Sequence, residues 1–206
     1  MMIQGVSIPE MVNQSVTVLT KPGVATFEQF ERRGGQREGF VYVGTAAAIG
    51  AIISLLVGVF TMGPVGGIIS GIAAFILPLV GFFLSGTLIH YIGTTQGGTG
   101  TKDEVFYTIS LFLAPILAIN GTIGNIPLLA CLVAPLTLAL GIYQIYLGYL
   151  SIRSSMNLDQ NKAIITMVVS WLVQVVALAI LGGVIGALLV ATGAVPPVVL
   201  PPIPTN

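Results

Sequence analysis

The apolar stretch FVYVGTAAAIGAIISLLVGVFTMGPVGGIISGIAAFILPLVGFFLSGTLIHY, residues 40–91, is long enough to cross a membrane twice. It contains no Asp, Glu, Lys or Arg, and one spanning helix needs about 20 apolar residues. Its densest cluster of helix breakers is GPVGG at 63–67. We therefore predict a first span over 40–62, a tight reversal at GPVGG and a second span over 68–91.

The rest of the chain continues this pattern. Of the 206 residues, 55% are hydrophobic and 7% are charged, against about 25% charged in an average soluble domain. Charge-free runs at 105–152 and 163–206 are divided by NGTIGN at 120–125 and by a polar loop at 153–162. They predict further spans at 105–119, 126–152 and 163–190. The sequence thus predicts an all-α, five-span transmembrane helix bundle.

Five spans place every charged residue on one side of the membrane. The N-terminal segment, the 93–104 loop and the 153–162 loop then share a face, and they carry all seven Lys and Arg. Basic residues accumulate in cytoplasmic loops, so we predict a cytoplasmic N-terminus and a C-terminus on the opposite side. The predicted domains are a cytoplasmic segment at 1–39, a membrane domain at 40–191 and a Pro-rich non-cytoplasmic tail at 192–206.

The N-terminal segment contains a short amphipathic pattern. We predict a helix over 27–33, capped by Thr26, that lies at the headgroup level of the membrane. Its expected anchors are two rings that enter lipid and two cations near phosphates: Phe27, Phe30, Arg32 and Arg33. A docking handle for a soluble partner is the alternative. Residues 1–20 alternate weakly and are expected to be extended.

Catalytic side chains are scarce. No predicted span carries Asp, Glu, Lys or Arg in its middle, and the glycine-rich loop at 92–102 lacks the GxxxxGK[ST] pattern of a phosphate-binding loop. We expect no enzyme, no metal site and no bound cofactor. His90 is the one candidate axial ligand for a pigment or metal, and an interfacial hydrogen-bonding role is its alternative. The net charge of zero argues against a nucleic-acid partner.

Small and polar residues in the spans predict helix packing. Two ridges of glycines spaced four residues apart would let helices approach closely, namely Gly63, Gly67 and Gly71, and Gly182 and Gly186. We expect them to pack within one chain, with a second copy as the alternative. Gln144 and Gln174 are predicted to lie at similar depth and to form a cross-helix hydrogen bond.

Three segments together resemble prokaryotic members of the Yip family, which relate to eukaryotic Ypt/Rab-interacting membrane proteins. They are VLTKPGVATFEQF (18–30), GGTGTKDEVFYTISLFLAP (97–115) and IYQIYLGYLSIRSSMNLDQNKAIITMVV (142–169). The resemblance covers about residues 18–190 and implies a five-helix protein with a cytosolic N-terminus. The resemblance implies no Rab binding, because eukaryotic members bind Rab GTPases through a longer cytosolic region that carries a DLYGP-like motif. Residues 1–39 contain no such motif.

Three functions fit these features. The first is a non-enzymatic scaffold or interaction protein, including an accessory subunit of a larger membrane complex, whose partners are membrane lipids and other integral membrane proteins or a second copy. The second is a transporter or channel for a lipid or weakly polar solute. It requires a cavity that reaches mid-membrane, lined by residues such as Ser54, Ser70, Ser110, Gln144 and Gln174. The third is a cofactor-holding subunit. The expected location is the cytoplasmic (inner) membrane of a prokaryote.

Overall fold

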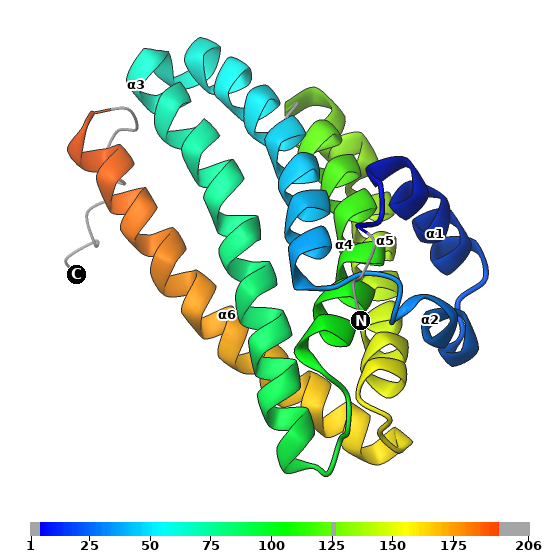
Figure 1. The fold of residues 1–206 in the computed structure, drawn as a ribbon. Helices are drawn as coiled ribbons and strands as arrows, with labels where there is room; N and C mark the ends of the chain where they lie inside the picture. The colour runs from blue at the N-terminus through cyan, green and yellow to red at the C-terminus, as the bar shows by residue number, and fades with distance from the viewer. Residues whose placement is uncertain (1–4, 125–126, 194–206) are drawn as a thin grey trace, which may run out of the picture.

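Residues 5–124 and 127–193, which the computed structural model describes, form helices joined by short loops and contain no strand. The helices are α1 (Ile8–Thr20), α2 (Val24–Phe30), α3 (Gln36–Thr95), α4 (Lys102–Ile123), α5 (Pro127–Ser155) and α6 (Gln160–Ala191). Figure 1 shows α1 and α2 beside the α4–α5 pair, and α6 beside the second half of α3. The predicted all-α class is confirmed. The Pro-rich tail predicted at 192–206 lies almost wholly outside the described residues.

Helix α3 is a hairpin of two arms, joined at Gly63. This residue has φ 77° and ψ 175°, which ends the first arm. The following Pro64 disfavours helical backbone at position 63, and glycine tolerates the positive φ. Pro64 then opens the second arm, because the first turn of a helix needs no N–H there. The predicted reversal therefore falls inside GPVGG, but it needs one residue rather than five.

The two arms of α3 touch through glycines. A Cβ atom at Gly67 would lie 2.5 Å from the backbone nitrogen of Val59 and 2.9 Å from the carbonyl oxygen of Leu55. Gly71 approaches Leu55 in the same way. The hydroxyl of Ser54 also donates to the carbonyl of Ser70 at 3.4 Å. Gly67 and Gly71 thus pack within the chain, whereas Gly63 serves the turn and has open space around it.

Four of the described helices are long and apolar enough to cross a membrane, namely α3, α4, α5 and α6. Their most apolar windows have mean hydropathies from 1.4 to 2.5. In α4, half of the residues in this most apolar window are buried inside the protein, whereas in α6 none of them are. Helix α4 is therefore the centre of the bundle, while α6 keeps an outer face. The predicted third span over 105–119 was too short, since α4 has 22 residues.

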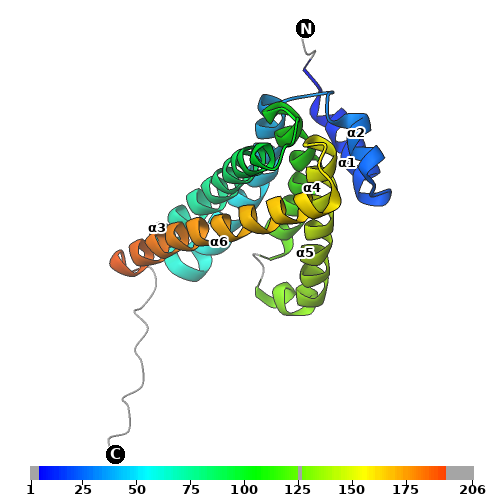
Figure 2. The same cartoon turned by 90° about the horizontal axis from the view of Figure 1, so that it is seen from below.

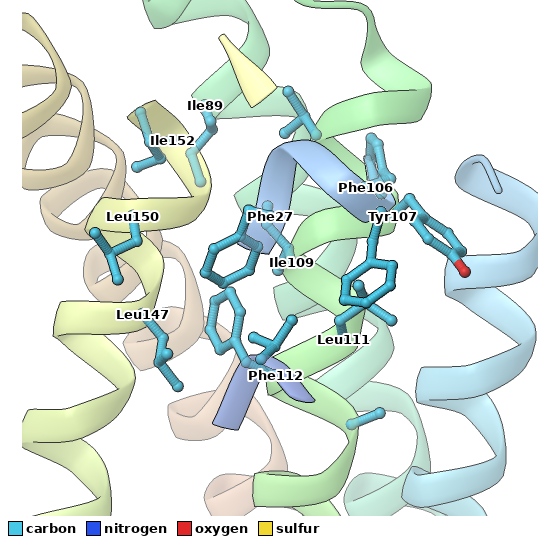
Figure 3. Close-up of a cluster of buried hydrophobic side chains, with 14 of the residues drawn as sticks. Phe27, Ile89, Phe106, Tyr107, Ile109, Leu111, Phe112, Leu147, Leu150 and Ile152 are labelled. Carbon is cyan, nitrogen blue, oxygen red and sulfur yellow. The ribbon is translucent and has the colours of Figure 1, made fainter. Parts of the chain in front are cut away.

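The hydrophobic core surrounds α4 at the end nearest the polar loops. Its fully buried side chains include Phe106, Tyr107 and Leu111 of α4, with Leu147 of α5 and Phe27 of α2. Figure 3 shows Phe27 close to Phe112 and Leu147, and Tyr107 pointing away from them. The hydroxyl of Tyr107 donates to the side-chain oxygen of Gln14 in α1 at 2.7 Å. The N-terminal helices therefore belong to the same folded unit as the spans.

Helix α1 corrects the expectation that residues 1–20 are extended. Ser7 stands at the N-cap with extended backbone, Pro9 lies in the first turn and Glu10 favours that end of the helix dipole. Met11, Ser15 and Val18 form its buried face at helical spacing. The short run VTVLT, residues 16–20, alternates like a strand, but the longer helical period decides the structure.

The glycine-rich loop packs backbone to backbone against the loop between α5 and α6. The backbone amide of Thr99 donates to the carbonyl of Met156 at 3.1 Å, and the side-chain amide of Asn157 donates to the hydroxyl of Thr99 at 3.1 Å. A Cβ atom at Gly100 would lie 1.6 Å from the carbonyl oxygen of Ser155. Glycine is needed here because two chain segments meet without room for a side chain.

Candidate functional site

The two rings of α2 lie inside the protein. Phe27 is 0% exposed and Phe30 is 6% exposed. The ring of Phe27 meets that of Phe112 in α4 edge to face, with centroids 6.3 Å apart (Figure 3). This corrects the expectation that both rings enter lipid. The amphipathic pattern correctly predicts a buried helix face, but it cannot distinguish burial in lipid from burial in protein.

The cations next to α2 remain at the surface. The Arg32 side chain is 77% exposed and donates through Nε to Glu104 of α4 at 3.0 Å. Arg33 is half exposed, 3.8 Å from Glu10, and its guanidinium lies over the ring of Phe30. Exposed ion pairs contribute little to stability, so these contacts leave both arginines available to an anionic surface.

Glu31 is a buried acid at the junction of α2 and α5. Its side chain is 7% exposed and accepts a hydrogen bond from the hydroxyl of Ser154 at 2.7 Å. Burial raises the pKa of the Glu31 carboxyl above its ordinary 4.5, and the nearby Glu104 and Glu28 carboxylates raise it further. The Ser154 hydroxyl and the Arg32 guanidinium oppose that rise. The folded state thus binds this proton more tightly than the unfolded chain does.

Attachment of α2 to the rest of the protein is therefore expected to strengthen as the pH falls toward 4.5, the ordinary pKa of the Glu31 carboxyl. The Glu31 contribution is complete below the unfolded pKa and is lost as the pH rises through the raised folded pKa. Amide hydrogen exchange of residues 24–31, corrected for intrinsic rates, measures it. Glu31→Gln should flatten the dependence. Glu28→Gln, at an exposed position, should reduce it only a little, because the Glu28 carboxylate contributes least to the rise of the Glu31 pKa. An unchanged slope in Glu31→Gln would contradict this assignment.

The second glycine ridge has no partner within the described chain. A Cβ atom at Gly182, Gly183 or Gly186 of α6 would meet nothing within 4 Å. The expectation that Gly182 and Gly186 pack within one chain is thus corrected. Because α6 diverges from α5 after their shared loop (Figure 2), this stretch keeps an open face.

Gln174 does not bond to Gln144. Its side-chain oxygen accepts from the hydroxyl of Ser85 at 2.6 Å, and its amide donates to the carbonyl of Gly81 at 3.2 Å. Both partners belong to the second arm of α3, so this pair of bonds ties α6 to α3. Gln144 makes no hydrogen bond to another described residue. The predicted cross-helix bond is corrected, because α6 packs on α3 and leaves α5 at this depth.

A groove of about 910 Å³ lies where α6 leaves α5. Its floor is formed by buried side chains of α3 and α4, such as Phe82, Ile109 and Phe112. Its rim is formed by exposed side chains of α5 and α6, such as Ile142 and Trp171. The volume is within the range of pockets that hold small ligands. The groove is thus partly enclosed and opens between two apolar helices.

Most of the groove wall is apolar, with a few uncharged polar groups. Gln144, Gln174, Ser85, Ser170 and Thr137 supply them, and no Asp, Glu, Lys, Arg or His lines the groove among the described residues. Two of the five predicted cavity residues, Gln144 and Gln174, are therefore correctly placed. Ser54 lies between the arms of α3 instead. Ser110 is buried in the core and donates to the carbonyl of Tyr107.

His90 lies away from this groove. It is half-buried near the end of α3. No group of three His, Cys, Asp or Glu side chains that could hold a metal ion occurs in the described part of the chain. Among these residues the imidazole therefore has no such group with which to share a metal ion.

Sequence reasoning missed Ser85, Ser170 and Gly141 as groove residues. The sequence does contain a sign of two of these residues, because residues four apart lie on the same helix face. Gly81 and Ser85 are four apart on α3, and Ser170 and Gln174 are four apart on α6. Small residues at such spacing on one helix, facing a polar pair on another, indicate a close and partly polar helix contact. Which helices meet was not readable from spacing alone.

These features define an α-helical integral membrane protein with a lateral groove in its apolar region. The model of the Yip1 domain matches residues 16–193, so the chain belongs to the Yip1 domain family. This confirms the resemblance drawn from three segments of the sequence. Comparison with curated proteins and with solved structures finds no match in either.

Proposed function

We propose that this protein is a non-enzymatic membrane protein that takes up a lipid-like molecule into the groove between α5 and α6. The groove itself carries the proposal: about 910 Å³ of mostly apolar volume, with its mouth between helices whose outer faces are apolar. A water molecule would find few hydrogen-bond partners in this apolar space, whereas a hydrocarbon chain from the bilayer matches its polarity. This favours the transporter or lipid-handling alternative over a purely structural role.

The proposed topology has five spans, which are the two arms of α3 and helices α4, α5 and α6. The contact between the arms at Gly67 and Gly71 supports it, because a straight helix of 60 residues would be about 90 Å long. All basic residues then share the cytoplasmic side with the N-terminus, where Arg32 and Arg33 can meet lipid headgroups. We place the protein in the cytoplasmic membrane of a prokaryote, following the family resemblance. Cysteine labelling that put positions 33 and 153 on opposite sides would contradict this topology.

Filling the groove should weaken the binding of a lipid-like molecule. Gly141 of α5 lines the groove, and a Cβ atom there would meet nothing within 4 Å. We therefore expect Gly141→Leu to be accommodated and to occupy part of the binding volume. It also replaces glycine within a helix, which favours the helix by about 1 kcal/mol. We expect the affinity for a long-chain amphiphile to fall by about tenfold or more, since several apolar contacts are lost.

The single tryptophan reports on this binding. Trp171 lines the groove, and a brominated long-chain probe that enters should quench its fluorescence saturably. Gly186→Leu is the matched control, because it makes the same substitution at another open helical glycine outside the groove. The control should retain the saturable quenching of the wild type. Equal quenching of Gly141→Leu and wild type would overturn the proposal.

A scaffold role is the second candidate, and the open glycine face of α6 favours it. Gly182, Gly183 and Gly186 meet nothing within 4 Å, and such faces allow close approach of another membrane helix. The same two variants separate the functions. Gly186→Leu should weaken co-purification of a second tagged copy or a membrane partner, and Gly141→Leu should leave it unchanged. Unaltered co-purification of Gly186→Leu would remove this candidate.

A further inference from the structure

The groove contains polar groups that the protein itself does not satisfy. From them we infer the chemistry of its occupant: a long apolar chain that carries one uncharged hydroxyl or carbonyl group. This inference rests on the proposed function, and it adds the kind of headgroup that the groove would recognise.

Ser170 is the central observation. The residue is 3% exposed and lines the groove, and its hydroxyl oxygen is buried without a hydrogen-bond partner among the described residues. A buried polar group without a partner costs free energy, so a group supplied by a ligand would lower the energy of this site. The buried hydroxyls of Ser151 and Thr108, by contrast, bond to each other at 2.9 Å. Thr166, one turn before Ser170, is also without a partner among the described residues, but it does not line the groove.

Gln144 supplies a second open group from the opposite wall. Its amide lines the groove and makes no hydrogen bond to another described residue, although it carries both donors and an acceptor. Gln174 behaves differently, because both ends of its amide are occupied by Ser85 and Gly81. The groove therefore has one satisfied amide that holds the helices together and one amide that is free for a ligand.

The polar groups share one level of the bundle. Ser85 lies ten residues before the end of α3, Ser170 ten residues after the start of α6, and Gln144 eleven residues before the end of α5. At 1.5 Å per residue, these positions lie about 15–17 Å along their helices from the end that carries the polar loops. A hydrocarbon core is about 30 Å thick, so the open groups lie deep within it.

The absence of charge restricts the headgroup. No acidic or basic side chain lines the described groove, so nothing there would pair with a phosphate, a carboxylate or an ammonium group. Bringing such a group to this depth without a counter-charge costs several kcal/mol. A serine hydroxyl and a glutamine amide can instead donate to a carbonyl, or donate to and accept from a hydroxyl. The site thus selects a neutral amphiphile.

The test compares one brominated chain in three forms, which end in a methyl, a hydroxyl or a carboxylate group. Quenching of Trp171 in the purified full-length protein gives the affinity of each. We expect the hydroxyl form to bind about five- to tenfold more tightly than the methyl form, and the carboxylate form to bind more weakly than the hydroxyl form. Ser170→Ala combined with Gln144→Leu should remove the hydroxyl preference, so that the hydroxyl form binds no more tightly than the methyl form. Ser170→Thr, which keeps the hydroxyl, should retain the preference.

The outcomes distinguish this inference from the proposed function. Equal binding of the methyl and hydroxyl forms, the tightest binding for the carboxylate form, or a preference that survives the double substitution would overturn the headgroup assignment while leaving a chain-binding groove. Failure of all three forms to quench wild-type Trp171 saturably would instead overturn the groove as a binding site. Retained methyl binding in the double variant shows that the variant is folded.

Discussion

Gly100→Ala is expected to destabilise the protein by about 3 kcal/mol or more, although it adds only one methyl group. That methyl would lie 1.6 Å from the carbonyl oxygen of Ser155, and further close atoms belong to the backbone of Ser155 and Met156. Backbone cannot rotate away as a side chain can. The loops that follow α3 and α5 would have to separate, breaking the bond from the Thr99 amide to the Met156 carbonyl.

The measurement is the thermal unfolding midpoint of the detergent-purified protein. Gly23→Ala is the matched control, because it lies in a loop between two helices and its nearest contact would be 3.7 Å away, at Thr26. Gly23 is also an N-cap, where replacing glycine changes stability modestly. A midpoint for Gly100→Ala equal to that of Gly23→Ala would show that the two loops do not pack as described.

Gly67→Leu is expected to have a comparable effect by forcing the two arms of α3 apart. Its Cβ would lie 2.5 Å from the backbone nitrogen of Val59, so the clash is with the opposite arm of the hairpin itself. The cost should reach about 3 kcal/mol, near the upper end of overpacking in a close-packed interior. The hydrogen bond from Ser54 to the Ser70 carbonyl would also be lost.

Gly186→Leu serves as the control for this second substitution. It places the same side chain on an apolar helix, where it meets nothing within 4 Å. A cysteine pair at positions 54 and 70 measures the approach of the two arms directly. Cross-linking of this pair should be efficient in the otherwise wild-type protein, and it should fall when Gly67→Leu is added. Undiminished cross-linking and an unchanged unfolding midpoint in Gly67→Leu would contradict the close approach of the arms.

The helices were largely predictable because a segment that crosses lipid must be apolar and almost free of charge over about 20 residues. Uncharged runs interrupted by breakers gave span positions within a few residues of α3, α5 and α6. The start of α4 was also indicated by its acids. Thr101 accepts from the amide of Glu104, and the Glu104 carboxylate accepts from the amide of Thr101, which forms a capping box.

The contacts between helices were less predictable. Glycine spacing cannot say which ridge finds a partner, so Gly67 and Gly182 looked alike in sequence although one is packed and the other is open. Gln144 and Gln174 both line the groove, but their spacing along the chain does not determine which helices are neighbours. The groove follows from that arrangement, because α6 pairs with α3 and leaves α5.

Helix α4 also bears on how the chain enters a membrane during synthesis. Its inward surface carries hydroxyls, including Thr108 and Ser110, and every residue from Val105 to Phe112 is covered by other parts of the protein. Such a segment is stabilised mainly by neighbouring helices rather than by acyl chains. The α3 hairpin precedes α4 in the chain, so it is synthesised first. It can therefore cover the hydroxyl-bearing surface of α4 as soon as α4 enters the membrane.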